Sequence, residues 1–517
     1  MVEAAFRPKN PMLVATVVSI AAFMEVLDTT IANVALSQIA GSIGASSEES
    51  TWILTSYLVS NGIVLPLSGW LSGLMGRKNF FIACILGFTL TSFLCGIANS
   101  LTLLIVFRLL QGLAGGGLQP AQQAIIKDSF PPEKLGMAFA ITGITTVLAP
   151  IIGPALGGYI TDNYNWRWIF FMNVPVGLLA AFLVKLLVED PPSAQKRPLG
   201  SIDYIGLSLI ALGLGALQIV LDKGQQEDWF DSSFIIVFSV IAAVGLITAV
   251  FWLLQQKHPI VKLQLFKIPS FGMPCVMMFF VGFALYSGTT LLPMLVQTYF
   301  GYNATLSGLL LSPGGLAVLT VMPLVGRLVN KVQAKYLVSF GMAIMALGMW
   351  ATGQITPQTD YWTFALVRVL QTLGLPFLFV PVTTLAFSKI SREESSNASA
   401  IISLMRNLGG SVGIAIVTNY LIHRQQVEQA YLAERLTASD WGYSHAMAAL
   451  SQKLTQFGIP SGEVSQYAMG KIYQELIHQA GILAFCDAYH FVAAVSLCLA
   501  VAALFMPNNK NSDEINA

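Results

Sequence analysis

The chain has 517 residues, of which 55% are hydrophobic and only 10% charged, and its mean hydropathy is +0.69. The formal net charge of +1 and the dispersed basic residues give no basis for nucleic-acid binding. Apolar residues fall in repeated long blocks, which is typical of a polytopic membrane protein and excludes an ordinary soluble domain.

The N-terminal apolar run, residues 12–36, follows Arg7 and Lys9. It is too long for a signal-peptide core and has no convincing cleavage site after it, so we expect an uncleaved first span. All five cysteines lie inside apolar runs and none has a metal-ligand spacing. No disulfide and no metal site is therefore expected.

Each membrane crossing needs about twenty apolar residues. On that basis the sequence predicts about fourteen transmembrane helices and an all-α fold, with both termini on one side of the membrane. The expected spans are 12–37, 51–73, 79–98, 101–127, 135–160, 166–188, 203–221, 231–254, 270–299, 305–328, 335–353, 361–388, 396–422 and 482–506.

The first span carries two carboxylates, Glu25 and Asp28, close to the small residues Ala21, Ala32 and Ala35. Three residues of helix place the two acids about 60° apart on one face. Ionisable residues inside a membrane span are costly and usually face a protein interior or a water-filled cavity. The pair therefore suggests proton or cation handling.

Other spans carry isolated charges that could pair with these acids. A permanent ion pair that only fixes helix packing is an equal alternative for each arginine. His490 is more consistent with a packed or interfacial histidine than with a proton carrier, and Asp487 lies near the end of its helix, where it can reach water. The further charged or titratable positions are Arg108, Arg368, Arg406, Asp487 and His490.

An internal repeat relates the two parts of the chain: VFRLLQGL at 106–113 matches LVRVLQTL at 366–373. Two homologous halves of six helices follow from it, with two helices inserted between them. The expected units are 12–188, 203–254 and 270–506.

The fifth span is rich in glycine and proline. Small residues allow close helix contact, while proline removes a backbone hydrogen bond. A stiff, kinked helix between the halves is expected from this pattern, whose members are Pro150, Gly153, Pro154, Gly157 and Gly158.

Residues 423–481 form a long polar segment without cysteine. Segments of this length in a compact protein are usually functional or disordered, so a docking surface or a lid is the functional interpretation. Two stretches, 427–436 and 447–454, could be amphipathic helix. Basic residues cluster in the loops on the side of the N-terminus, so the positive-inside rule makes both termini cytoplasmic and places 423–481 outside.

Together these motifs resemble the major facilitator superfamily, and within it the fourteen-span drug:H+ antiporter (DHA2) family and the EmrB-type inner-membrane subunits of tripartite pumps. The resemblance runs from about residue 20 to 506. It rests on LDTTIANVAL at 27–36, RLLQG at 108–112, GPALGG at 153–158, NVPVG at 173–177, and LDKG at 221–224 with DWF at 228–230.

The resemblance implies proton-driven export of hydrophobic or amphipathic drugs across a bacterial inner membrane by alternating access, with no cofactor beyond the proton gradient. It also implies an EmrA-like periplasmic membrane-fusion adaptor and an outer-membrane channel as partners. Asp28, Glu25 and Arg108 would couple protons to transport. The expected cavity residues are Met24, Gln111, Gln119, Tyr286, Met294, Gln297, Arg368, Gln371 and Phe377.

One departure from the superfamily concerns the loop after the second span, where Gly73 and Leu74 replace the usual acid and base. The usual charged contact on the cytoplasmic side is therefore incomplete. A proton-coupled symporter, or an exporter of one specific metabolite with the same fold, remains an alternative. A membrane enzyme is disfavoured because the sequence has no paired catalytic or nucleotide-binding motif.

Overall fold

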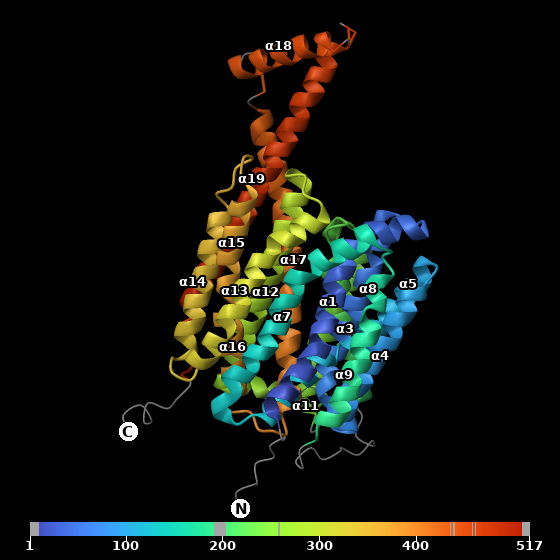
Figure 1. Cartoon of the computed structure of the whole chain (residues 1–517), viewed down its shortest axis with the longest axis vertical. Helices are drawn as coiled ribbons and strands as arrows, with labels where there is room; N and C mark the ends of the chain where they lie inside the picture. Colours follow the sequence, from blue (N-terminus) through green and yellow to red (C-terminus); the bar gives the residue numbers. More distant parts are fainter. Residues whose placement is uncertain are drawn as a thin grey trace, which may run out of the picture.

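The computed structural model describes residues 10–190, 203–256, 259–434, 436–437, 440–457, 459–460 and 462–508. All regular structure in these ranges is helical. Fourteen of the described helical segments are long and apolar enough to cross a membrane, as the sequence predicted. The first helix begins and the last one ends at the same end of the bundle (Figure 1), which we call the terminal side. A helical hairpin formed by the described residues of 423–481 projects from the opposite end, which we call the hairpin side.

The N-terminal half supplies the first six spans. Two of these spans, the fourth and the sixth, are each built from two consecutive helical segments. The elements are α1 (Pro11–Ile43), α2 (Ser47–Ser50), α3 (Trp52–Met75), α4 (Arg77–Ile97), α5 (Leu101–Gly115), α6 (Leu118–Ser129), η1 (Pro132–Lys134), α7 (Leu135–Asn163), α8 (Trp168–Phe171) and α9 (Asn173–Leu187).

Two inserted helices and the C-terminal half follow. The inserted α10 packs against α11 and α3, and α12 packs against α17. The elements are α10 (Tyr204–Lys223), η3 (Trp229–Asp231), α11 (Ser233–Gln255), η4 (Leu263–Lys267), α12 (Pro269–Tyr299), α13 (Ala304–Leu328), α14 (Ala334–Thr352), α15 (Tyr361–Leu373), α16 (Leu375–Phe387), α17 (Ser395–Ala433), α18 (Trp441–Gln456) and α19 (Val464–Ala503).

Several helices begin at a side chain that caps them. The Asn10 side chain accepts a hydrogen bond from the amide of Leu13 at 3.3 Å, and Pro11 then occupies the first helical position. Ser100 caps α5 and Asp203 caps α10 in the same way. Such caps satisfy amide groups that have no partner within the helix, so they fix where each span starts.

The two halves meet mainly along α7 with α13 and α3 with α17, and also where α6 contacts α17 and α7 contacts α16. Glycine makes the close approach possible. A Cβ atom built on Gly326 of α13 would lie 3.1 Å from the carbonyl oxygen of Gly136 in α7, and one on Gly69 of α3 would lie 2.9 Å from Cα of Asn397 in α17. Small residues at these points let two backbones pack directly against each other.

The hairpin side differs from the long loop that the sequence suggested for 423–481. The last two spans continue as helices past the expected boundaries, α17 to Ala433 and α19 back to Val464. The described part of the segment between them holds α18, which lies across the two helical stems well beyond the rest of the bundle (Figure 1). Both stretches expected to be amphipathic, 427–436 and 447–454, are largely helical.

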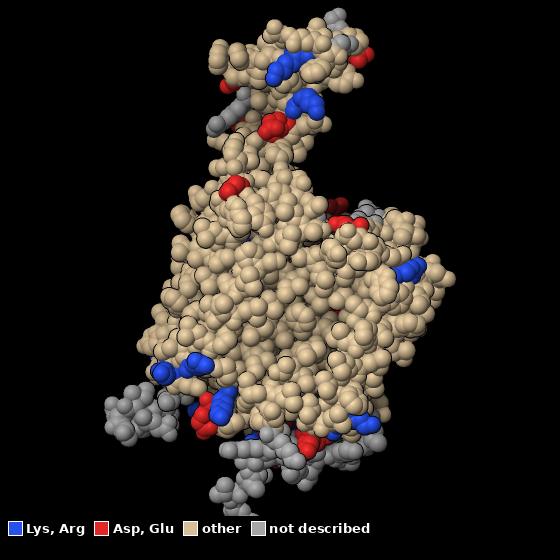
Figure 2. Space-filling view, viewed as in Figure 1, with Lys and Arg blue, Asp and Glu red and all other residues tan. Residues whose placement is uncertain are grey.

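The surface of the bundle has the character of a lipid-facing protein. Large apolar side chains of α11 are exposed, among them Val237, Val244 and Phe251. Figure 2 shows a broad uncharged band between charged residues at the two ends of the molecule. A contiguous apolar surface of this size would be unstable in water, so a bilayer is its expected environment.

Candidate functional site

The two acids of α1 are both buried in the protein, as the sequence predicted. Glu25 is 4% exposed and Asp28 is 3% exposed. They do not share partners, however. Each carboxylate lies in its own set of hydrogen-bond donors, and the two sets belong to different groups of helices.

Asp28 forms an ion pair with Arg108 of α5, with Oδ2 at 2.6 Å from NH1. Its other oxygen accepts hydrogen bonds from Asn173 at 2.7 Å and from Gln111 at 3.2 Å. The guanidinium also donates to the backbone oxygen of Ile53 and lies 4.4 Å from the Tyr57 ring centroid. Opposite charge and several donors offset the cost of burying this carboxylate.

Glu25 has no ion-pair partner among the described residues. It accepts hydrogen bonds from the Tyr57 hydroxyl at 3.0 Å, from Asn61 at 3.1 Å and from Gln119 at 2.6 Å. These donors come from α3 and α6. A buried carboxylate held only by neutral donors is the kind of group that can gain and lose a proton in a functional cycle.

Gln119 connects this carboxylate to the other half of the protein. Its side-chain oxygen accepts a hydrogen bond from Arg406 of α17. Arg406 is fully buried. The Tyr286 ring of α12 lies against α17 at Gly410, one turn further along, where an added Cβ would be 2.5 Å from the ring. Gln119, Arg406 and Tyr286 are thus brought together from three helices.

The C-terminal half contains a counterpart of the Arg108 site. Arg368 NH1 donates to the Gln371 side chain at 3.1 Å and to the backbone oxygen of Gly288 at 3.1 Å, as Arg108 does to Gln111 and Ile53. Gln371 in turn donates to Thr352. Arg368 has no ion-pair partner among the described residues. The repeat therefore preserves the arginine and glutamine but not the acid.

The remaining cavity candidates take no part in the hydrogen bonds of these polar clusters. Met24 is buried in the core, Met294 is 41% exposed, and Phe377 packs edge-on against Phe340 at 5.1 Å. Gln297 donates to Ser307 at 3.2 Å. Of the predicted cavity residues, the structure thus places Gln111, Gln119, Tyr286, Arg368 and Gln371 at or beside buried charges.

Asp487 and His490 of α19 also lie apart from the acids of α1. Asp487 forms an ion pair with Arg424 at 2.7 Å, near the base of the hairpin stems. His490 contacts the Gln354 side chain at 2.8 Å. Both contacts stay within the C-terminal half, and they are consistent with a role in packing.

The glycine and proline pattern of α7 lies between α1 and α13. A Cβ on Gly153 would be 2.0 Å from Oγ1 of Thr30, and one on Gly157 would be 3.2 Å from Cα of Ile31. On its other face, Pro154 and Ala155 contact Gly308 of α13. α7 is one unbroken helix through Pro150 and Pro154, so its small residues position the acid-bearing α1 against the opposite half.

The terminal side carries inter-half contacts that the sequence did not reveal. Arg77 forms an ion pair with Asp128 and also donates to the backbone oxygen of Arg392 in the C-terminal half. Lys127 donates to the backbone oxygen of Phe387 at 2.8 Å. Together they join the halves although the loop lacks the usual acid and base at Gly73 and Leu74.

Two further contacts reinforce this junction. The Ser72 and Ser396 hydroxyls, on α3 and α17, are 3.4 Å apart, and the rings of Phe139 and Phe387 stack at 5.1 Å. The terminal side of the molecule is therefore closed by polar and apolar contacts between the halves.

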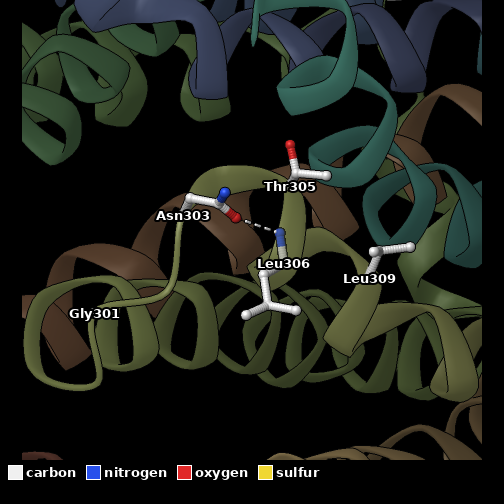
Figure 3. A pocket seen from close by; sticks show the side chains of 5 residues that line it. All are labelled: Gly301, Asn303, Thr305, Leu306 and Leu309. Carbon is white, nitrogen blue, oxygen red and sulfur yellow. Dashed lines mark hydrogen bonds between the residues drawn. The ribbon is translucent and has the colours of Figure 1, made fainter.

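On the hairpin side, a shallow hollow of about 400 Å³ lies at the start of α13 (Figure 3). Asn303 caps the helix by accepting from the Leu306 amide at 2.8 Å. Thr305 donates to Asp162 of α7 at 2.8 Å. None of the residues that line the hollow is charged, and none contacts Glu25 or Asp28, so it is not a candidate for the coupling site.

Sequence reasoning missed three donors to the buried acids: Tyr57, Asn61 and Asn173. All three are polar side chains within apolar spans, which was the available signal. Asn173 stands in the NVPVG stretch that carried part of the resemblance, but its contact with Asp28 spans 145 residues and no local pattern predicts it.

Comparison with known proteins identifies relatives along almost the whole chain. The model of the Major Facilitator Superfamily matches residues 18–414. The chain is 37% identical over 464 residues to the multidrug export protein EmrB of Haemophilus influenzae, covering 89% of each sequence. It is 36% identical to EmrB of Escherichia coli K12, covering 93% of this chain and 92% of that protein.

A third relative is the fatty acid resistance protein FarB of Neisseria gonorrhoeae, 37% identical over 86% of each sequence. Among solved structures, the human organic anion transporter MFSD10 superposes with a TM-score of 0.60 at 12% identity, covering 95% of this chain and 99% of that one. A XylE double tryptophan mutant gives 0.59 at 13% identity, covering 99% of both chains. At these identities the structural likeness concerns the fold alone.

Proposed function

The chain belongs to the Major Facilitator Superfamily, and we propose that it is a proton-driven exporter of hydrophobic and amphipathic compounds. The observation that carries the proposal is the pair of buried acids on α1, of which Asp28 is paired to Arg108 and Glu25 is held by neutral donors. The names of the relatives, which are multidrug export proteins, support the direction of transport.

In the proposed cycle, protons enter from outside and neutralise Asp28 and Glu25, while Arg108 stabilises the ionised form of Asp28. Substrate and proton favour opposite conformations of the two halves, because only a difference in binding energy between states can drive the exchange. In this proposal, the polar residues around Arg368 and Tyr286 contact the substrate inside the bundle. The scattered methionine and aromatic surfaces suit varied apolar ligands.

We further propose that the terminal side faces the cytoplasm of a bacterial inner membrane. Lysine residues in the loops and first helical turns of this side, such as Lys78, Lys331 and Lys335, support this orientation by the positive-inside rule. The hairpin side then extends into the periplasm, where α18 would meet an EmrA-like membrane-fusion adaptor that leads to an outer-membrane channel.

The decisive test uses purified protein in liposomes with an imposed pH gradient and a panel of lipophilic dyes. Antiport predicts that an acidic lumen drives dye into the vesicles. Asp28→Asn should abolish this gradient-driven uptake while insertion stays intact, because the variant side chain can no longer bind and release a proton. Uptake that an acidic lumen opposes would instead support a symporter, and wild-type rates in Asp28→Asn would refute the assignment of that residue.

A further inference from the structure

The buried Arg406 is the observation from which this inference starts. It belongs to the C-terminal half, is 0% exposed, and forms no ion pair among the described residues. Its NH2 atom donates to the Gln119 side chain, whereas its Nε and NH1 atoms have no hydrogen-bond partner in that part of the chain. A buried cation without an ion-pair partner is costly, so a carboxylate close to Arg406 would stabilise it.

The compensating charge lies one side chain away. Gln119 donates from Nε2 to Oε2 of Glu25 at 2.6 Å and accepts at its oxygen from Arg406. A guanidinium can only donate and a carboxylate can only accept, so the amide can serve both neighbours in one orientation alone. Glu25, Gln119 and Arg406 thus form an ion pair bridged by an amide, which links α1 and α6 to α17 across the two halves.

The other acid of α1 cannot replace Glu25 in this role. Asp28 is neutralised by Arg108, and its donors Gln111 and Asn173 belong to the same half. Among the described residues, the other ionisable groups facing the bridge are Tyr57 of α3, which donates to Glu25, and Tyr286 of α12, whose ring lies against Gly410, one turn from Arg406. Protonation of Asp28 therefore changes contacts within the N-terminal half, whereas protonation of Glu25 removes the negative charge that Gln119 connects to Arg406 in the C-terminal half.

We propose that Gln119 and Arg406 transmit the protonation state of Glu25 to the C-terminal half, with Gln119 as the positioning residue. Ionised Glu25 holds α17 against α1 and α6 in the arrangement seen here, in which the terminal side is closed. Protonated Glu25 leaves Arg406 without a counter-charge and releases α17, so the terminal side can open. This role rests on the proposed proton-driven function and specifies which of the two acids signals between the halves.

The test follows opening of the terminal side directly. Spin labels on the exposed Asn79 of α4 and Lys331, beyond α13, report the distance between the halves in the full-length protein in nanodiscs. In the wild type, acidification from about pH 8 to about pH 5, which spans the range in which a buried carboxylic acid can titrate, should shift the population toward longer distances. Glu25→Gln should show the long distance throughout.

Two substitutions of Gln119 separate the proposal from a packing role. Gln119→Leu removes the bridge and should abolish the pH-dependent shift. Gln119→Glu gives Arg406 a carboxylate of its own, so the closed population should persist to lower pH than in the wild type. The matched control is Gln122→Leu, one turn along the same helix, whose side chain contacts Ser19 and Thr145; it should keep the wild-type shift.

If both Gln119 variants open at the wild-type pH, the proposal is wrong. The same result with intact gradient-driven dye uptake would leave proton-driven export standing and remove only this connection. If the wild type showed the distance shift but no gradient-driven dye uptake, the proposed function would instead be wrong. Monodispersity in detergent shows whether each variant is folded before its distances are compared.

Discussion

At the scale of single residues, the two acids of α1 illustrate how similar side chains acquire different surroundings. Asp28 has a cation at 2.6 Å, and Glu25 has three neutral donors. The difference arises from which helices face successive turns of α1. Because proton binding depends on local charge and hydrogen bonding, the two acids should not be interchangeable in transport.

Arg108 offers a test of the buried pair. Arg108→Ala leaves Asp28 without its counter-charge and should destabilise the protein by about 3–5 kcal/mol, seen as a lower melting temperature in detergent. The double variant Asp28→Asn/Arg108→Gln removes both charges and should recover most of that stability without recovering coupled transport. Equal destabilisation in the single and double variants would argue that Arg108 acts through packing alone.

The sequence predicted the acids themselves, their burial and the presence of Arg108 because charges stand out in apolar spans. It did not predict that Glu25 and Asp28 would have separate partners. Those partners, such as Asn61 and Asn173, are placed by contacts between helices distant in the sequence, and hydropathy carries no information about rotation of one helix against another. The roles assigned to these residues remain predictions.

At the scale of helices, α7 packs against α1 with one face and against α13 with the other. Its glycines accommodate α1 on one face and its other face packs against α13, so it sets the distance between the acid-bearing helix and the opposite half. The sequence located this helix by its glycines and prolines. The sequence could not show which neighbouring helix approaches closely at each glycine.

Gly153 is the position at which this packing can be tested. An alanine there would place Cβ 2.0 Å from Oγ1 of Thr30, so the helices must separate or the Thr30 side chain must rotate. Overpacking of this kind costs about 1–3 kcal/mol, and Gly153→Ala should lower both thermal stability and efflux. Gly62→Ala in α3, where a Cβ meets nothing within 4 Å, is the control and should behave as the wild type.

The span boundaries show where hydropathy alone locates the end of a helix and where it does not. Most predicted spans begin or end within a few residues of the observed helices, since the bilayer requires a long apolar run. The exceptions are α17 and α19, which continue beyond the apolar region as polar helices. A change in polarity marks the edge of the membrane, whereas a helix ends only where its backbone hydrogen bonding stops.

At the scale of the whole molecule, the structure shows the conformation in which the terminal side is closed. Arg77 is central to it because its guanidinium reaches both Asp128 and the backbone oxygen of Arg392. The contact compensates for the missing acid and base at Gly73 and Leu74. Hence the departure from the usual loop pattern does not leave the halves unconnected.

Arg77→Ala should therefore favour opening of the terminal side. A cysteine introduced at Ser396, which is only 9% exposed, should react slowly with a membrane-impermeant thiol reagent in the otherwise wild-type protein and several-fold faster with Arg77→Ala. The native cysteines must first be replaced. An unchanged reaction rate would mean that the remaining contacts, such as Ser72 with residue 396 and Phe139 with Phe387, close this side without Arg77.

The hairpin side provides a test of the proposed partner. Trp441 and Phe457, at the two ends of α18, are 79% and 85% exposed, and apolar side chains of this size are often binding determinants. Trp441→Ala/Phe457→Ala should weaken pull-down of a purified EmrA-like adaptor while dye transport in liposomes is unchanged. Trp362→Ala, an equally exposed aromatic outside the hairpin, is the control. Undiminished pull-down would place the docking surface elsewhere.

The stems of the hairpin have a mechanical consequence. α17 is 39 residues long and α19 is 40, so each rod measures about 60 Å at 1.5 Å per residue. Both helices belong to the C-terminal half, and α17 also carries Arg406. A small tilt of that half would be magnified into a lateral swing at α18, in the manner of a lever. A partner protein bound at α18 would consequently move with each conformational change of that half, or would oppose it.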